Sequence, residues 1–329
     1  MQNKGGPRLL VTDREGALYL ERARVHVEGN RVVYHIADDE HRREYNIPHV
    51  NLAVLFIGQG TSITQDAMRL LGEEGVHLAV TGTGGSPLHM GGLTAYAATR
   101  HFREMLPIYQ SSSKSLLAAK AVLTDRSARM RKFGGAAAKK MLRQRDLSGL
   151  STACATFDKN LGDCTNIQQL LGFEGVFAKS CYREFSKMSG LSKTGVFRRD
   201  PGSKGDRTTV NPNELTKRVN RLIDHGNYLC YGMAGAALWA LGIPPHMSVF
   251  HGKTRAGGLV FDIADAFKDA IVLPLAFASV TNTKDDNPEK AFRGRLINVF
   301  DDRRILVEAI GTVERMIEAS KEKKPASDA

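Results

Sequence analysis

The spacing of apolar residues changes once along the chain, near residue 92 of 329. Before that point apolar residues recur at every second position, as at Leu18 and Leu20 and again through "RVVYHI". This spacing is typical of half-buried strands, and "EGN" at 28–30 is expected to be a hairpin tip. From about residue 95 onward the spacing is helical. The sequence therefore predicts an α+β protein with a β-rich N-terminal domain, residues 1–92, and a larger all-α domain, residues 93–316.

Finer signals divide these parts. "NLAVLFIGQGTSIT" predicts a buried strand ending in glycines, followed by a short helix capped by Ser62 or Thr64. The basic stretch 114–145 predicts one long helix or a broken pair, with Gly134–Gly135 as the weak point. The segments around Glu174 and around 212–242 predict further helices. Residues 317–329 are charged and poor in apolar side chains, so a disordered tail is expected.

The net charge limits the choice of partner. The chain carries a formal charge of +11 with a pI near 9.5, which favours an acidic partner such as nucleic acid or an anionic membrane surface. It has no run of roughly 18 apolar residues and no apolar signal core at its N-terminus. The four cysteines include no CxxC pair and suggest reduced thiols. A cytoplasmic protein that does not enter membranes is expected.

The stretch "FHGKTRAGGLVFDIADAFKD", residues 250–269, carries the densest set of functional side chains. Its "GKT" resembles part of a phosphate-binding loop, but that motif needs a glycine where this chain has Met247. The backbone cradle for phosphate is therefore not specified, and nucleotide binding at this point is not expected.

The aspartates of this stretch share one side of a predicted helix. If a helix begins near Gly258, then Asp262, Asp265 and Asp269 lie opposite an apolar face. One interpretation is a solvated acidic face. The other is that Asp262 and Asp265, one turn apart, direct their carboxylates at one cation. Asp269 belongs to no recognised motif and is expected to be solvated.

Glu174 and His251 also allow two interpretations. Glu174 lies on the apolar stripe of its helix, where a carboxylate must be paired with a buried base or bound to a metal. His251 follows an apolar run and is either a hydrogen-bonded structural residue or a ligand. Taken together, Glu174, His251 and Asp265 would form a mixed oxygen and nitrogen set that suits Mg²⁺ or Mn²⁺. Such an ion could stabilise charge on a phosphodiester and activate a hydroxyl nucleophile.

Basic residues cluster in two places and could hold a polyanion beside such a site. No acid interrupts the segment 126–145, and Lys253 and Arg255 follow His251 directly. The alternative for any single helix is a solvated basic face. The basic residues predicted to contact DNA are Arg129, Arg131, Lys132, Lys139, Lys140, Arg143, Lys253 and Arg255.

Three segments together carry a family resemblance. "LLGFEGVFAKS", "RLIDHGNYLCYGMAGAALWALGIPP" and "FHGKTRAGGLVFDIADAFKDAIVLPLAF" resemble the CRISPR-associated integrases of the Cas-one family. The N-terminal "YNIPHVNLAVLFIGQGTSITQDAMRLLGEEGVHLAVTGTGGSPL" is similar to the I-F subtype. The resemblance covers roughly residues 8–285, and the combined motifs are highly specific.

The resemblance implies both a fold and a site. It implies a β-sandwich-like N-terminal domain that dimerises and a helical catalytic domain. The family's metal ligands fall on Glu174, His251 and Asp265, and its supporting aspartate falls on Asp262. The implied cofactor is Mg²⁺ or Mn²⁺. The implied partners are double-stranded and branched DNA, a second copy of the chain, and the Cas-two protein, which in the I-F subtype is fused to the helicase–nuclease.

The resemblance implies insertion of captured DNA fragments into a CRISPR array by transesterification, with metal-dependent DNA cleavage at the same site. Two alternatives stay open at the sequence level. A stand-alone structure-selective DNA repair nuclease would use the same metal cluster. A non-catalytic DNA-binding scaffold would keep the positive charge without needing the carboxylates.

Overall fold

The N-terminal part is built from strands. The computed structural model describes residues 14–36, 43–81, 88–90, 99–194, 197–200, 214–252, 257–281 and 288–321. The first four-stranded sheet has the order β1 (Glu15–Leu20), β5 (Leu52–Ile57), β7 (His77–Val80), β8 (Leu88–Met90). The second has the order β4 (Tyr45–Asn46), β3 (Arg31–Ile36), β2 (Ala23–Glu28), β6 (Ser62–Ile63). Helix α1 (Gln65–Glu73) lies between β6 and β7 in the chain.

Local sequence explains these elements. β2 and β3 pair antiparallel out to Glu28 and Arg31, so the hairpin turns at Gly29–Asn30, as predicted. Both turn residues have positive φ, 54° and 62°, which glycine and asparagine tolerate best. The Thr64 side chain accepts a hydrogen bond from the Ala67 amide and caps α1, as predicted.

The two sheets face each other across a shared core. Every residue of β5 is buried, and the apolar core between the sheets includes Leu20 and Leu55 from the first sheet and Val25 from the second. Leu71 of α1 joins the same core. This packing confirms the expected β-sandwich-like N-terminal part.

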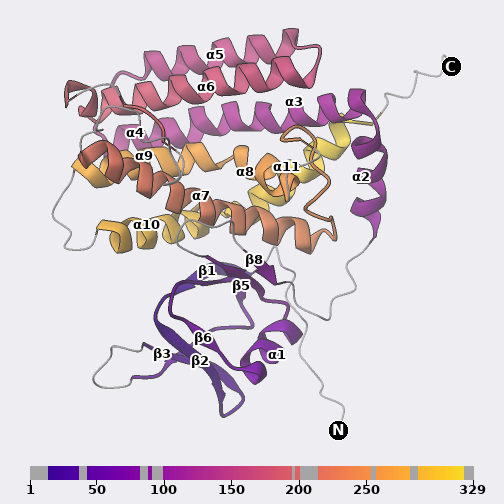
Figure 1. Cartoon of the computed structure of the whole chain (residues 1–329), viewed down its shortest axis with the longest axis vertical. Helices are drawn as coiled ribbons and strands as arrows, with labels where there is room; N and C mark the ends of the chain where they lie inside the picture. Colours follow the sequence, from indigo (N-terminus) through magenta and orange to yellow (C-terminus); the bar gives the residue numbers. More distant parts are fainter. Residues whose placement is uncertain are drawn as a thin grey trace.

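Helices form most of the described chain after β8 (Figure 1). They are α2 (Arg100–Gln110), α3 (Ser112–Arg129), α4 (Gly135–Met141), α5 (Ser148–Asp163), α6 (Ile167–Met188), α7 (Glu214–Ala240), α8 (Gly258–Asp265), α9 (Lys268–Thr281), α10 (Pro288–Asp302) and α11 (Ile305–Ala319). A π-helical turn, Met130–Gly134, separates α3 from α4 at the predicted weak point. Among the helices that the structure describes, none combines the length and apolar character needed to cross a bilayer.

The C-terminal helix corrects one prediction. Helix α11 continues to Ala319, and Ser320 is buried and donates to the Lys114 carbonyl. The predicted start of the tail, residue 317, is therefore too early. The last apolar residues of α11 pack against the helical bundle and keep this part of the chain helical. Residues 322–329 lie outside the described part of the chain.

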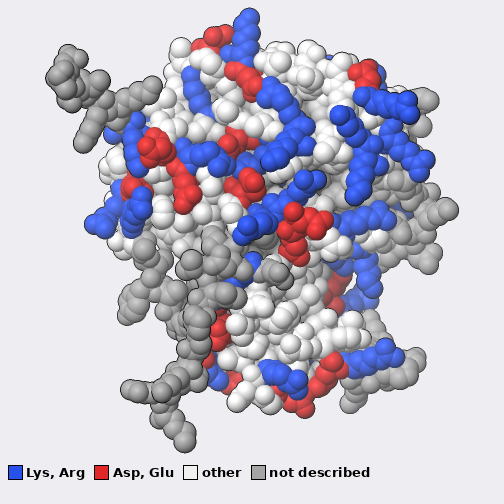
Figure 2. Space-filling model, turned by 180° about the vertical axis from the view of Figure 1, so that it is seen from behind, with Lys and Arg blue, Asp and Glu red and all other residues white. Residues whose placement is uncertain are grey.

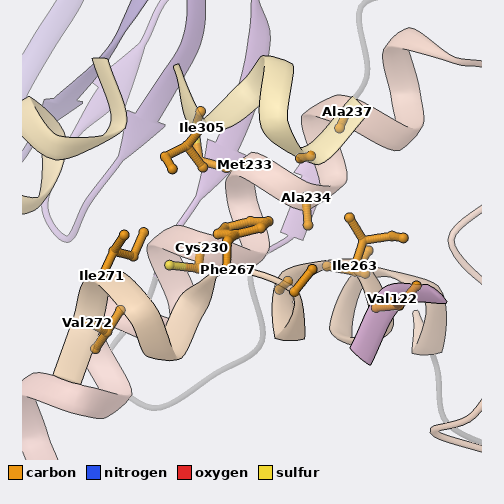
Figure 3. Close-up of a cluster of buried hydrophobic side chains, with 14 of the residues drawn as sticks. Val122, Cys230, Met233, Ala234, Ala237, Ile263, Phe267, Ile271, Val272 and Ile305 are labelled. Carbon is orange, nitrogen blue, oxygen red and sulfur yellow. The ribbon is translucent and has the colours of Figure 1, made fainter. Parts of the chain in front are cut away.

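The strand-rich and helical parts share a core. Helix α7 approaches β5 so closely that a Cβ at Gly232 would lie 2.3 Å from Cε1 of Phe56. Figure 3 shows the core on the helical side, where Val122 of α3, Met233 of α7, Ile263 of α8 and Phe267 gather. Because α8 is surrounded by these elements, all eight of its residues are buried.

Candidate active site

Asp262 is anchored by the chain segment that precedes α8. Its side chain is fully buried. Its Oδ2 accepts from the Ser248 hydroxyl at 2.9 Å and the Val249 amide at 2.6 Å, and its Oδ1 accepts from the His251 amide at 3.1 Å. A buried carboxylate is stable only when it is satisfied in this way. Asp262 therefore fixes the backbone that carries His251.

His251 is oriented by the same carboxylate. Its Nδ1 lies 2.7 Å from Asp262 Oδ1, so Nδ1 carries the proton when the ring is neutral and Nε2 keeps its lone pair. Nε2 lies 3.4 Å from Asp265 Oδ2. Burial alone would lower the pKa of His251, but the Asp262 hydrogen bond and the charge of Asp265 outweigh it and hold the pKa above its ordinary value.

Asp265 is buried and only half satisfied. Its Oδ1 contacts the Lys268 ammonium, while its Oδ2 has no hydrogen-bond partner among the described residues. Burial opposes ionisation, yet the charges of Lys268 and Arg126 lower the pKa of Asp265 to about 2. Lys268 is half-buried against Asp265. Burial alone would lower the pKa of the ammonium, but the charge of Asp265 outweighs it and raises that pKa well above its ordinary value. The cluster therefore contains an ionised carboxylate with one free buried oxygen, placed beside His251 Nε2.

Arg126 of α3 links the remaining carboxylates. Its Nη1 lies 2.5 Å from Glu174 Oε1 and 3.8 Å from Asp265 Oδ2, and its Nη2 lies 2.5 Å from Asp269 Oδ2. The guanidinium is also 5.5 Å from the centre of the Phe177 ring. Glu174 is thus paired with a buried base, which is one of its two interpretations from the sequence. The same base lies near Asp265.

The structure brings Glu174, His251, Asp262 and Asp265 into one cluster, but the three predicted ligands do not have donor atoms all within 4.8 Å of one another. Among the described residues, only His26, His35 and Glu44 offer three suitable atoms within 4.8 Å of one another. Glu174 meets Asp265 through Arg126 rather than directly.

The charges nevertheless fit a divalent cation. The cluster holds four carboxylates, of Glu174, Asp262, Asp265 and Asp269, and two described basic side chains, of Arg126 and Lys268. With His251 neutral, two of these negative charges have no compensating base among the described side chains. Together with the free Oδ2 of Asp265, this donor set suits Mg²⁺ or Mn²⁺.

Two predictions are wrong. Asp269 is not solvated: it is 1% exposed and pairs with Arg126. Arg129 does not belong with the residues predicted to contact DNA, because it is buried and its guanidinium binds Glu308 at 2.8 Å and Asp125 at 3.2 Å.

The other predicted DNA contacts divide into two groups. Lys253 and Arg255 lie outside the described residues. Five basic residues on or just after the π-helical turn and α4 are exposed, and of these Arg131 pairs with Asp158. The set is Arg131, Lys132, Lys139, Lys140 and Arg143. This segment packs on α9 beside the cluster, since a Cβ at Gly134 would lie 3.6 Å from Ala270.

Sequence reasoning missed Arg126 and Lys268 as members of the site. Arg126 was counted only among the basic residues of its helix. It lies three and four positions after Leu123 and Val122, which are buried, so the apolar spacing of α3 could have revealed it. Lys268 follows Asp265 by three residues, the spacing of a helical ion pair.

The fold and the site define a class: a β-sandwich-like part joined to a helical bundle that holds a histidine, four carboxylates and two bases in one cluster. Asp262, Asp265, Asp269 and Arg126 of this cluster are buried. Residues 18–300 match the family described as CRISPR associated protein Cas1. A protein of Pectobacterium atrosepticum named CRISPR-associated endonuclease Cas1 is 33% identical over 93% of each chain. A protein of the same name from Pseudomonas aeruginosa is 36% identical over 82% of this chain and 84% of its own. The chain belongs to the Cas1 family.

Solved structures share the fold. A casposase bound to integration product superposes with a TM-score of 0.72 and 16% identity over 94% of this chain and 92% of its own. The TtCas1–DNA complex superposes with a TM-score of 0.66 and 23% identity, over 95% of this chain and 94% of its own. A chain of a Cas6-RT-Cas1–Cas2 complex superposes with a TM-score of 0.64 and 14% identity, over 93% of this chain and 35% of its own. At these identities the likeness establishes the architecture.

Proposed function

We propose that this protein is a metal-dependent DNA integrase and endonuclease of CRISPR adaptation. The 3′-hydroxyl of a captured DNA fragment attacks a phosphodiester at the edge of a CRISPR repeat. One phosphorus–oxygen bond forms and one breaks, and the displaced 3′-oxygen leaves with a proton, so no external energy source is needed. The observation that carries the proposal is the cluster of His251, Asp265 and Glu174 in a member of the Cas1 family. With His251 neutral, the described bases of this cluster leave two negative charges uncompensated.

Mg²⁺ or Mn²⁺, held by Glu174, His251 and Asp265, would supply Lewis-acid stabilisation of the phosphoryl charge. Asp262 holds His251 in the tautomer that presents Nε2, and Asp265 offers its free Oδ2 toward the same point. Glu174 must leave Arg126 to join them. Arg126 remains compensated after that step because it keeps Asp269.

The basic segment around α4 supports DNA binding beside the cluster. Lys132, Lys139, Lys140 and Arg143 can each contact phosphate without first breaking a described ion pair, whereas Arg131 must leave Asp158. Figure 2 shows many Lys and Arg side chains over the helical part of one face, with patches of Asp and Glu between them. The TtCas1–DNA complex and the casposase bound to integration product are structural relatives that handle DNA.

The partners belong to the same proposal. We infer a homodimer formed through the β-rich part, which leaves the helical parts free to hold DNA. A Cas2 partner is supported by the related Cas6-RT-Cas1–Cas2 complex. In the I-F subtype that partner would be fused to the helicase–nuclease. DNA insertion places the protein in the cytoplasm, where the CRISPR array lies.

A strand-transfer assay tests the function. Purified protein with its Cas2 partner, a short DNA duplex with free 3′-hydroxyls and a repeat-containing plasmid are mixed with Mg²⁺ or Mn²⁺. Wild type should join the duplex to the repeat edge, and Glu174→Ala should not, while both bind DNA equally. Equal joining by both proteins contradicts the assignment. Cleavage of branched DNA without any joining would instead favour the repair nuclease.

A further inference from the structure

A second set of ligand side chains lies on the outward face of the sheet β4–β3–β2, remote from the helical part (Figure 1). On β2, Val25 faces the core and His26 faces outward. The antiparallel register pairs His26 with Val33, so His35, two residues further along β3, is its diagonal neighbour. Carrying the β3–β4 register one step past Tyr34–Tyr45 places Glu44 opposite His35. Three strands thus bring two imidazoles and a carboxylate together.

The distances suit a metal ion. One donor atom each from His26, His35 and Glu44 lies within 4.8 Å of the other two. His26 Nε2 and Glu44 Oε1 are 3.3 Å apart, long for an N–H···O hydrogen bond. Two ligands of a tetrahedral zinc ion, with bonds of about 2.0–2.1 Å, lie about 3.3–3.4 Å apart. The His26–Glu44 spacing therefore matches that of two ligands on one ion, and the donor atom of His35 lies within 4.8 Å of both.

The hydrogen bonding of His26 is incomplete in every protonation state. Its Nδ1 is buried and has no hydrogen-bond partner among the described residues. If Nε2 carries the proton, the Nδ1 lone pair has no donor. If Nδ1 carries it, that N–H has no acceptor and the Nε2 lone pair faces the Glu44 carboxylate. A cation bound at Nε2 removes the repulsion between the Nε2 lone pair and the Glu44 carboxylate, because that lone pair then becomes a ligand.

We propose that His26, His35 and Glu44 bind one transition-metal ion of the Zn²⁺ class, with the fourth position open to water. Imidazole ligands select Zn²⁺, Co²⁺ or Ni²⁺ over Mg²⁺, so this site differs in metal preference from the active site. The ion ties the two-residue strand β4 to the β2–β3 hairpin, where the backbone register offers only two residue pairs. Its role is to stabilise this edge of the sandwich.

Cobalt titration of the full-length protein tests the site. Co²⁺ is the probe because its tetrahedral complexes with histidine and carboxylate absorb visible light, whereas octahedral Co²⁺ absorbs weakly. The protein should show one such absorbing equivalent that Zn²⁺ displaces and that a large excess of Mg²⁺ does not displace. Zn²⁺ should also raise the melting temperature.

Variants locate the ion. Glu174→Ala should keep the absorbing equivalent, and His35→Gln should weaken it by at least about tenfold, since even outer groups of a metal site change affinity by about 10–100-fold. His49→Gln is the matched control: His49 is a half-buried histidine of the same part whose Nδ1 faces the Ile47 carbonyl. Far-UV circular dichroism checks that each variant folds. Equal Co²⁺ binding by wild type and His35→Gln, or loss of the signal in Glu174→Ala alone, overturns the proposal.

Discussion

At the scale of single residues, the site depends on Arg126. This arginine is buried among three carboxylates and forms 2.5 Å contacts with Glu174 and Asp269. Arg126→Ala leaves those carboxylates without their base, which is expected to lower the free energy of unfolding by about 3–5 kcal/mol. Urea denaturation measures the loss, and Mn²⁺ should restore more stability to this variant than to wild type. Arg131→Ala is the control, because its ion pair with Asp158 is exposed and should contribute at most about 1 kcal/mol. Equal losses in both variants would contradict the account.

Asp262 acts through His251. Its carboxylate accepts from the Ser248 hydroxyl, from backbone amides and from His251 Nδ1. Asp262→Asn removes the charge that fixes the histidine tautomer, and Mn²⁺ affinity is expected to fall by about 10–100-fold. Mn²⁺ titration followed by electron paramagnetic resonance measures the change. Ser248→Ala, which removes one neutral donor, should have a smaller effect. An Asp262→Asn protein that binds Mn²⁺ like wild type would show that Asp262 only holds the backbone.

At the scale of elements, the sequence predicted strands and helices well and the surroundings of α8 poorly. Alternation located the β2–β3 hairpin, and the Gly134–Gly135 pair located the break after α3. The burial of Asp269 could not be predicted because a helical wheel assumes that one face meets water. Here α8 is buried along its whole length, Asp269 lies in the first turn of α9, and Arg126 from a distant helix pairs with it. Metal-ligand assignments needed the family resemblance, since spacing alone left Glu174 and His251 open.

The junction of α7 and β5 makes a prediction about packing. A Cβ at Gly232 would lie 2.3 Å from the Phe56 ring, so Gly232→Ala is expected to destabilise the protein by about 1–3 kcal/mol through overpacking. Gly172→Ala in α6 meets nothing within 4 Å and should stabilise it by up to about 1 kcal/mol, because alanine favours helices. Chemical denaturation midpoints should therefore move in opposite directions. A shift of the same sign in both variants would refute the close packing.

At the scale of the whole molecule, the charge of +11 should govern DNA affinity. The triple variant Lys139→Gln, Lys140→Gln, Arg143→Gln is expected to reduce the slope of log affinity against log salt by about one unit for each phosphate that the variant no longer neutralises. Fluorescence anisotropy with duplex DNA at several salt concentrations measures this slope. Arg69→Gln, an exposed arginine on α1 in the strand-rich part, is the control and should leave the slope unchanged. An unchanged slope in the triple variant would show that DNA does not contact these three residues.

The central claim is that His251, Asp265 and Glu174 hold one divalent cation in place of the Arg126–Glu174 contact. Crystals grown with Mn²⁺ and measured by anomalous diffraction test it most directly. We expect a peak bounded by His251 Nε2, Asp265 Oδ2 and the Glu174 carboxylate, with Glu174 turned away from Arg126 and Asp269 still paired to Arg126. Absence of manganese from this cluster at saturating Mn²⁺, with Glu174 still bound to Arg126, would contradict it.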